Sequence, residues 1–361
     1  MLHNNIKFTR FSNLGLTLCK TPLMKRIILF SLVGLTTFLA NISAQDSQND
    51  QELTTIAFGS CSRQSLPQLM WPFVLDQSPD LWIWTGDNIY GDSEDMGVLK
   101  KKYDRQKSEA NYQKMRASMD IIGIWDDHDY GVNDGGKEFP KRAESRDLMF
   151  EFLNVPKSHP AWKREGAYQS YVYGTGARKV KVILLDARYF RDQLDRVNRV
   201  YQINETRDIL GEAQWAWLEA ELSDSDAAVH ILASGIQILP EDHAYEKWAN
   251  FPQARQRLLD LVAKTQPKNT FFISGDRHIA EISRQEIPGY GPVFDITSSG
   301  LTHSYEAVDQ EPNRHRVGKL IGEKNFGLIQ LNWADDGVEM RFQIRGLNGK
   351  LLDEYTPTWK P

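Results

Sequence analysis

Polar side chains that could hold metal ions follow four apolar segments of the sequence, at the point where each segment ends. They are Cys61; Asp87 with Tyr90; Asp126, Asp127 and His128; and Asp276 with His278. Carboxylates suit hard cations such as Ca²⁺, Mg²⁺ or Mn²⁺, whereas a thiolate, a phenolate and an imidazole favour a transition metal, for which iron is a good candidate. A carboxylate shared by the two sets could bridge two ions. Such a pair of metals stabilises both the attacking and the leaving oxygen in phosphoryl transfer.

The run Asp126-Asp127-His128-Asp129 is the hardest of these clusters to explain as ordinary surface. A solvated turn after a strand needs one aspartate, whereas this turn has three aspartates and a histidine. Gly86-Asp87 alone is typical of a turn in which the aspartate caps its own backbone, and it gains weight because three other segments end in similar side chains. Spacing does not show whether Asp126 or Asp127 would face a metal, because neighbouring side chains point apart.

Cys61 has no partner for a disulfide if Cys19 is removed with the leader described below. Three interpretations of Cys61 stay open: a buried and inert side chain, a thiolate held by a metal, or a nucleophile with a nearby histidine base. The sequence lacks the motifs of several other classes of enzyme. The sequence has no G-x-S-x-G elbow, no phosphate-binding G-x-x-x-x-G-K-[ST] loop, no G-x-G-x-x-G motif and no H-E-x-x-H pair.

Strands and helices that alternate along the chain must position these residues. Buried strands are expected at 54–58, 81–85, 121–125, 229–233 and 270–273, and a hairpin at 168–173 and 179–185. Helices are expected at 67–76, 98–118, 138–153, 211–222 and 255–264. Such β-α-β units predict a parallel or mixed sheet, whose strand ends form the edge where open α/β sheets bind ligands. Short strands follow, at 280–285, 292–297, 326–333 and 338–344. The expected fold class is therefore α/β (α+β), with a β-rich C-terminal part.

The N-terminus has the layout of a secretory signal peptide. Lys25-Arg26 precede an apolar run from Ile27 to Ala40, and small residues suited to cleavage end at Ala44. We expect a periplasmic or secreted protein with an N-terminal extension and signal peptide (1–44), a linker (45–53) and one domain (54–361). Translation could start at Met1 or Met24, and an uncleaved membrane anchor is the competing interpretation.

The charge of the chain argues against a nucleic-acid partner. Residues 1–44 hold five basic and no acidic residues, so the mature chain would carry 38 basic and 48 acidic residues and a net charge of −10. Nucleic-acid binding needs a basic face. We expect neither a nucleic-acid partner nor a stable membrane partner, and the sequence does not indicate an oligomeric state.

Taken together, these segments resemble the PhoD-like alkaline phosphatase family, a branch of the calcineurin-like metallophosphoesterases. The resemblance runs from about residue 54 to residue 300 and rests on four motifs in order: Gly59-Ser60-Cys61, Gly86-Asp87-Asn88-Ile89-Tyr90, Trp125-Asp126-Asp127-His128-Asp129 and Gly275-Asp276-Arg277-His278. It implies a four-layer α/β/β/α sandwich with mixed sheets and a site for two or more metals. It also implies an enzyme that hydrolyses small phosphate monoesters, diesters or both with a metal-activated water. Together with the predicted signal peptide, the leading interpretation is an exported phosphoesterase.

The resemblance also implies roles for single residues. The metal ligands would be Cys61, Asp87, Tyr90, Asp127, Asp276 and His278. Asp87 would bridge the metals and take part in catalysis, while Cys61, Tyr90 and His278 would bind Fe³⁺. Asp127 and Asp276 would bind a second ion, expected to be Ca²⁺, with another divalent metal as the alternative. His128 stands where the wider superfamily has its catalytic histidine.

The chain departs from the wider superfamily at three places. Ser60-Cys61 replaces a D-x-H motif, Gln237 replaces a histidine, and Gly275-Asp276-Arg277-His278 replaces G-H-x-H. These departures favour an iron–calcium site over an ordinary dimetal site, and they leave the role of Gln237 open. A non-catalytic, metal-stabilised cell-surface binding protein on a decayed phosphoesterase scaffold is the alternative function.

Other charged residues have two interpretations each. Arg63, Arg188 and Arg277 suit phosphate oxygens, and an ion pair with a nearby carboxylate is the alternative for each. The isolated histidines are expected to be structural or at the surface: His159, His230, His243, His303 and His315. Among these, His243 and His303 lie beside segments that look like the family.

Overall fold

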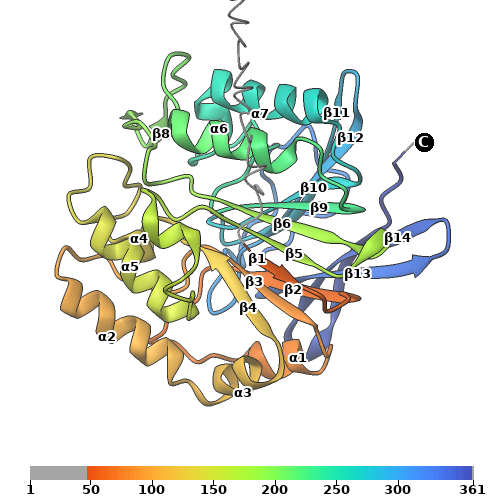
Figure 1. Ribbon diagram of the computed structural model, residues 1–361. Helices are drawn as coiled ribbons and strands as arrows, with labels where there is room; N and C mark the ends of the chain where they lie inside the picture. Colours follow the sequence, from red (N-terminus) through yellow and green to blue (C-terminus); the bar gives the residue numbers. More distant parts are fainter. Residues whose placement is uncertain (1–46, 360–361) are drawn as a thin grey trace, which may run out of the picture. The chain divides into compact units, whose positions relative to one another are not determined.

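Two β-sheets share a hydrophobic core in the part of the chain that the computed structural model describes, residues 47–359 (Figure 1). One sheet has six strands in the order β15-β14-β13-β2-β3-β4. The other has seven strands in the order β1-β5-β6-β9-β10-β12-β11. The expected signal peptide and its cleavage site lie outside the described residues.

The six-stranded sheet contains three predicted strands that run parallel. These are β2 (Thr55–Gly59), β3 (Leu81–Thr85) and β4 (Asp120–Ile124), and helices cross over between them. β13 (Asn325–Ala334) pairs antiparallel with β2 and continues the sheet through β14 (Gly337–Gly346) and β15 (Leu351–Tyr355). The C-terminal strands therefore complete the sheet that the N-terminal strands begin.

The seven-stranded sheet is mixed, as the sequence predicted. Its central strands β6, β9, β10 and β12 run parallel, and the predicted hairpin is the antiparallel pair β5–β6. The strands of this sheet are β1 (Ser47–Asn49), β5 (Gln169–Tyr173), β6 (Val180–Leu185), β9 (Val229–Ser234), β10 (Thr270–Ser274), β11 (Ala280–Ile287) and β12 (Gly291–Ser298). β1 lies within the stretch 45–53 that we expected to be a linker, and it pairs with β5 at the sheet edge. The domain boundaries as a whole remain a prediction.

Helices cover the outer face of each sheet, which gives four layers (Figure 1). α6 (Gly211–Leu222) and α7 (Pro252–Thr265) cover the seven-stranded sheet. The helices on the side of the six-stranded sheet are α1 (Trp71–Leu75), α2 (Met96–Lys107), α3 (Ala110–Ser118) and α5 (Arg142–Leu153). The mixed α/β fold class is confirmed, and its layers follow the expected α/β/β/α order.

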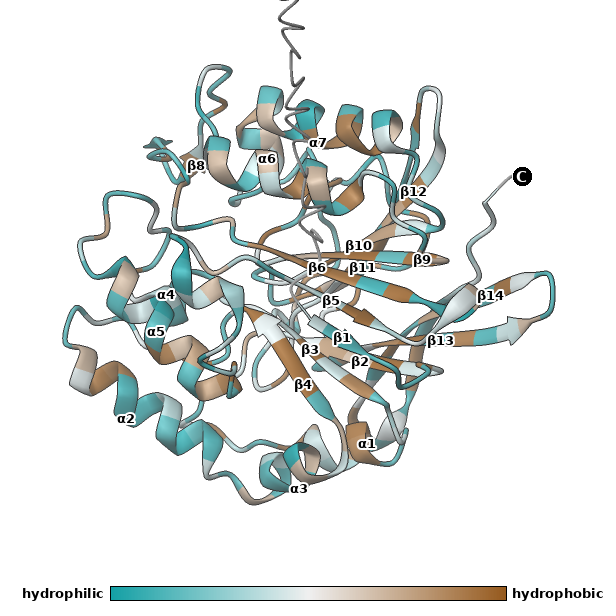
Figure 2. Ribbon diagram, in the orientation of Figure 1, coloured by the Kyte–Doolittle hydropathy of each residue, from teal (hydrophilic) through white to brown (hydrophobic). Residues whose placement is uncertain are grey.

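β6 shows how the sequence divides the core between the layers. Val182 and Leu184 belong to the core between the sheets, whereas Ile183 and Leu185 belong to the core under α6 and α7. Side chains of a strand alternate between its faces, so a strand buried on both faces needs an unbroken apolar run. Figure 2 shows hydrophobic strands in the middle of the domain. The helices that cover them are largely hydrophilic on their outer faces.

Four helices differ from their predicted boundaries. α5 begins at Arg142 rather than at 138, and α7 spans Pro252–Thr265 rather than 255–264. Residues 98–118 form two helices, α2 and α3, because the extended backbone of Glu109 interrupts the helix and its side chain caps α3 by accepting from the Tyr112 N–H. Of the predicted helix 67–76, only α1 forms, with Pro72 rather than Pro67 in its first turn.

Short elements complete the fold. They are α4 (Asp127–Tyr130), the β7–β8 hairpin (Arg196–Val197 with Val200–Tyr201) and the 3-10 turns η1 (Pro160–Lys163), η2 (Gly176–Arg178), η3 (Trp248–Asn250) and η4 (Leu347–Gly349). Within residues 47–359, none of the helices has the length and apolar character that a membrane span requires.

Candidate functional site

The carboxyl ends of β2, β3, β4 and β10 converge and bring the predicted site residues together from both sheets. Cys61 follows β2 and Asp87 follows β3, while Asp127 opens α4 directly after β4. Asp276 and His278 follow β10 in the other sheet. Segments that are almost 200 residues apart in sequence, such as Tyr90 and His278, therefore lie within hydrogen-bonding distance.

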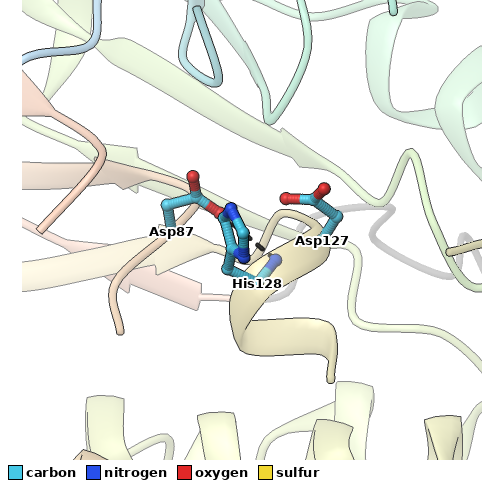
Figure 3. Close-up of side chains that lie close together, drawn as sticks. All are labelled: Asp87, Asp127 and His128. Atoms are coloured by element: carbon cyan, nitrogen blue, oxygen red, sulfur yellow. Dashed lines mark hydrogen bonds between the residues drawn. The ribbon is translucent and has the colours of Figure 1, made fainter. Parts of the chain in front are cut away.

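Four carboxylates form the centre of this site. Asp87, Asp126, Asp127 and Asp276 each offer an oxygen, and these oxygens lie within 4.8 Å of one another. A ring nitrogen of His128 lies within the same range of Asp87 and Asp127. Figure 3 shows Asp127 and His128 at the start of α4, with the His128 backbone N–H donating to Asp87 Oδ1 at 3.3 Å.

A second set of donors lies on the other oxygen of Asp87. Cys61 Sγ and Tyr90 Oη each lie 3.3 Å from Asp87 Oδ2. Tyr90 Oη is also 3.4 Å from His278 Nε2. Asp87 is thus shared by a carboxylate set and a set with sulfur, phenol and imidazole donors.

Asp126 and Asp127 have different partners, although both belong to the carboxylate set. Arg188 Nε donates to Asp126 Oδ1 at 2.7 Å, and both side chains are buried. Asp127 Oδ2 accepts from the backbone N–H of Asp134 at 2.7 Å. The other oxygens, Asp126 Oδ2 and Asp127 Oδ1, are buried and accept no hydrogen bond from the described residues.

His128 is held in one orientation at the edge of the site. Its Nδ1 lies 2.7 Å from Asp92 Oδ1, and its ring stacks on Tyr90 with 4.1 Å between the ring centroids. Burial alone would lower the pKa of His128, but the carboxylates of Asp87 and Asp92 raise it to about 10. The carboxylates around the ring therefore favour its protonated form.

Burial dominates the electrostatics of the other side chains. It raises the pKa of the Cys61 thiol to about 11, and it raises the pKa of Asp87 and Asp276 well above their usual range, to which neighbouring charges add. Burial would also raise the pKa of Asp127, but Arg188 and His128 lower it. Protein cations thus outweigh burial at Asp127, whereas His128 beside Asp87, and Arg277 and Arg188 beside Asp276, offset burial only in part.

The donor set fits bound metal ions. Buried carboxylates that are close together repel each other unless a cation lies among them, and two of their oxygens lack a hydrogen bond in the described part of the chain. Carboxylates are ligands for hard cations, whereas the sulfur, phenol and imidazole donors beyond Asp87 suit a transition metal. The chemistry of the cluster therefore suggests metal binding on both sides of Asp87.

The backbone is unusual at four of these residues. Cys61, Asp87, Asp276 and His278 have φ values of 61°, 50°, 68° and 54°. Left-handed backbone at a non-glycine residue costs about 1–3 kcal/mol and is often found at functional sites. Gly86, with φ 93°, lets the next loop approach closely, because a Cβ there would lie 2.4 Å from the Asp126 Cβ.

Sequence reasoning did not predict an orienting role for several residues, including Asp129, which it named only as part of a polar run. Asp129 accepts from the backbone N–H groups of Asp87 and Asn88, and Ser299 Oγ lies 3.0 Å from Cys61 Sγ. Asp92 was missed as well, although it lies only five residues after Asp87 in the same loop. Gln237 lies in a separate buried network, where its amide donates to Glu281 and Thr297.

The three candidate arginines differ in their partners. Arg188 forms ion pairs with Asp126 and Glu246, and Arg277 pairs with Glu311 at 2.7 Å. Arg63 is exposed and lies over the Tyr90 ring, and it has no carboxylate partner among residues 47–359. The ion-pair alternative therefore describes Arg188 and Arg277, and Arg63 is the one left available to an anion.

Of the isolated histidines, His303 lies beside the site. Its ring centroid is 4.4 Å from that of His278 and 5.0 Å from that of Tyr90. His243 is buried and accepts from the backbone N–H of Tyr245. The other three form hydrogen bonds elsewhere in the domain: His159, His230 and His315.

A cavity of about 270 Å³ opens onto the carboxylates. Asp127, His128, Asp276 and His278 line it together with Arg196, Tyr201, Tyr245 and Tyr305. The carboxylates of Asp134 and Glu246 also line it, so an anionic ligand would need cations bound among these acidic groups.

Comparison with known proteins finds a curated protein of similar sequence. Alkaline phosphatase D of Bacillus subtilis (strain 168) is 24% identical over 228 residues, which are 56% of this chain and 37% of that protein. The chain therefore matches well under half the length of this curated relative.

Two solved structures have a similar fold. A structure of PhoD superposes with a TM-score of 0.66 at 16% identity and covers 86% of this chain and 73% of its own. A dimetal phosphatase from Danio rerio has a TM-score of 0.53 at 15% identity and covers 86% of this chain and 100% of its own. The model of the PhoD-like phosphatase family matches residues 57–308, and this chain therefore belongs to that family.

Proposed function

We propose that the protein is an exported, metal-dependent phosphoesterase that hydrolyses phosphate monoesters, diesters or both. The observation that carries the proposal is the pair of donor sets that share Asp87, with carboxylates on one side and Cys61, Tyr90 and His278 on the other. Membership of the PhoD-like family and the name of the curated relative, alkaline phosphatase D, support it.

The residues around Asp87 would hold the metals. Cys61, Tyr90 and His278 would bind Fe³⁺, and Asp127 and Asp276 would bind Ca²⁺ or another divalent ion, with Asp87 between them. Bound metal ions would supply charge stabilisation for the phosphate and activation of a water. The main role of Asp126 would be structural. Its ion pair with Arg188 would hold the loop after β4 to the loop after β6.

The chain's own side chains would bind and orient the substrate. His128, fixed by Asp92, lies at the cavity wall and would hold or release a proton at its other ring nitrogen. Arg63 lies on a neighbouring cavity of about 470 Å³ together with Tyr90, Lys101, Lys102 and Arg105. The positive charge of these side chains would attract an anionic substrate to this cavity, although the protein as a whole is acidic.

Hydrolysis of p-nitrophenyl phosphate and bis-p-nitrophenyl phosphate tests the proposal. The purified protein should hydrolyse at least one of them, lose the activity in a chelator and regain it when metal is returned. The ratio of the two rates would show whether monoesters or diesters are preferred. Metal binding without hydrolysis of either ester would favour the non-catalytic alternative.

The proposed iron site has a spectroscopic test. A thiolate or phenolate bound to Fe³⁺ absorbs visible light by charge transfer, so the purified protein should be coloured and contain iron. Cys61→Ser and Tyr90→Phe should each shift or weaken the absorption. A colourless, iron-free and fully active protein would exclude Fe³⁺ and leave an ordinary Ca²⁺, Mg²⁺ or Mn²⁺ site.

Export is proposed from the sequence of residues 24–44. N-terminal sequencing of the protein from its native host should find a chain that begins near Gln45. An intact leader in the membrane fraction would favour the anchored alternative.

A further inference from the structure

Two tyrosine rings stand exposed on the cavity that contains the candidate metal ligands. Tyr245 and Tyr305 are 41% and 45% exposed, whereas most large aromatic side chains among the described residues are buried. Both belong to the lining that includes Asp127, His128, Asp276 and His278. Apolar side chains left exposed beside a polar site are a common mark of ligand contact.

The two rings face each other at an open spacing. Their planes are 30° apart and their centroids 6.3 Å apart, which is near the upper end of the range of about 4.5–7 Å over which aromatic rings pair. Tyr305 also lies next to the candidate ligands, because its ring centroid is 5.1 Å from that of His278. An aromatic group on Tyr305 would therefore lie close to a phosphate bound at the metals, and Tyr245 lines the same cavity.

Both tyrosines are held in place before any ligand binds. One face of Tyr245 covers the Arg277 guanidinium at 4.0 Å, and two hydrogen bonds of 2.7 Å to Glu311 fix that guanidinium. The backbone N–H of Tyr305 donates to the carbonyl of His278 at 2.8 Å. Rings that are already ordered lose little entropy when a ligand stacks on them.

We propose that Tyr245 and Tyr305 form a subsite for a planar aromatic group in the alcohol portion of the substrate, such as the base of a nucleotide. The subsite rests on the proposed function, because it assigns the ester's organic portion to a place beside the metals. The rings recognise a flat π-surface and not a particular base, since stacking tolerates any base. Nucleoside and aryl phosphates share this chemistry.

A matched ligand pair tests the subsite without turnover. The 5′-methylenephosphonate analogues of adenosine monophosphate and ribose 5-phosphate carry the same phosphonate, and only the first has an aromatic base. Calorimetry on the metal-replete protein should find the adenosine compound bound more tightly. Tyr245→Leu and Tyr305→Leu should each remove about five- to hundredfold of that preference, the range expected for loss of one stacking ring.

The ligand pair separates stacking from support of Arg277, because loss of that support should weaken the binding of both analogues equally. Tyr245→Phe and Tyr305→Phe keep the ring and should keep the preference, and Val197→Ala, on the exposed β7–β8 hairpin, should leave it unchanged. Equal binding of the two analogues by wild type, or an equal loss for both in the leucine variants, would overturn the subsite.

Turnover of the natural esters distinguishes this inference from the proposed function. The kcat/KM for adenosine monophosphate should exceed that for ribose 5-phosphate, and phenyl phosphate should reveal whether a simple aryl group is also accepted. If no ester is hydrolysed while ring-dependent binding persists, the proposed function fails and the subsite stands. If esters are hydrolysed without ring-dependent binding, the subsite fails and the proposed function stands.

Discussion

Asp87 is the residue on which the candidate site depends, because its two oxygens have different surroundings. Oδ2 faces Cys61 and Tyr90, while Oδ1 accepts from the His128 backbone N–H. Its pKa is raised by burial and by Cys61, so an isolated carboxylate at this place would not stay ionised as readily as one in water. A cation on either side would reverse that preference.

The types of the site residues could be predicted from the sequence, but the residues that orient them could not. Cys61, Asp87, Asp127 and Asp276 each follow an apolar run, which is a local signal. Arg188 reaches Asp126 across 62 residues, and Ser299 reaches Cys61 across 238 residues, so only the folded chain shows these contacts.

Arg63 gives a prediction at this scale. Arg63→Ala should reduce kcat/KM for p-nitrophenyl phosphate by about tenfold, roughly 1.4 kcal/mol, because the exposed guanidinium is free to bind a phosphate oxygen. Arg63→Lys should recover part of the loss, since it keeps the charge but not the bidentate geometry. Arg178→Ala removes an arginine already paired with Glu52 and serves as the control. An Arg63→Ala enzyme within twofold of wild type would assign Arg63 to packing on Tyr90.

At the scale of elements, the loops after the strands hold the site in strained backbone. Cys61, Asp87, Asp276 and His278 all have positive φ, and each lies in a loop after a parallel strand. The sequence predicted these strands and their ends, but left-handed backbone at cysteine, aspartate or histidine gives no sequence signal of the kind that glycine gives.

Gly86 tests how closely these loops must pack. Gly86→Ala should lower the free energy of unfolding by about 1–2 kcal/mol from its positive φ and by a further 1–3 kcal/mol from the collision with Asp126. Gly176→Ala is the matched control, because Gly176 also has positive φ but no atom lies within 4 Å of its added Cβ. Urea unfolding of both variants measures the difference. Equal losses would mean that the loop at Asp126 moves aside without strain.

His230, on β9, gives a prediction about pH that does not involve the site. Its Nδ1 lies 2.9 Å from the Lys268 carbonyl and its Nε2 lies 2.8 Å from Ser225 Oγ, and burial lowers its pKa to about 4. The unfolded chain, with a histidine pKa near 6.5, binds the proton more readily, so stability is lost as the pH falls from about 6.5 towards 4.

The size of this effect follows from the shift. Between pH 7.5 and pH 5, wild type should lose about 2 kcal/mol more than His230→Gln, which has no titrating group at this place. Urea unfolding of the two proteins at both pH values measures the difference. A constant difference between them would show that His230 is protonated equally in the folded and unfolded states.

At the scale of the whole described domain, the site exists only where the two sheets meet. Asp87 and Asp127 come from the six-stranded sheet, whereas Asp276 and His278 come from the seven-stranded sheet. The apolar runs predicted an α/β chain with a β-rich C-terminal part, and the two packed sheets were expected only from the resemblance to the family. The pairing of β13 with β2 could not be read from the chain, because it joins segments far apart in sequence by backbone hydrogen bonds that any side chain allows.

The central claim is that the cluster around Asp87 holds the metal ions that hydrolysis needs. The most direct measurement is metal content and kcat/KM for p-nitrophenyl phosphate, determined on the same preparations of wild type, Asp87→Asn and Asp295→Asn. Asp295 is a control because its buried carboxylate lies in a separate network, where it accepts from Ile238, Leu239 and Ser274. Asp87→Asn should lose bound metal and at least about a hundredfold in kcat/KM, roughly 2.7 kcal/mol, while Asp295→Asn keeps its metal. An Asp87→Asn protein with full metal content and activity within tenfold of wild type would contradict the account.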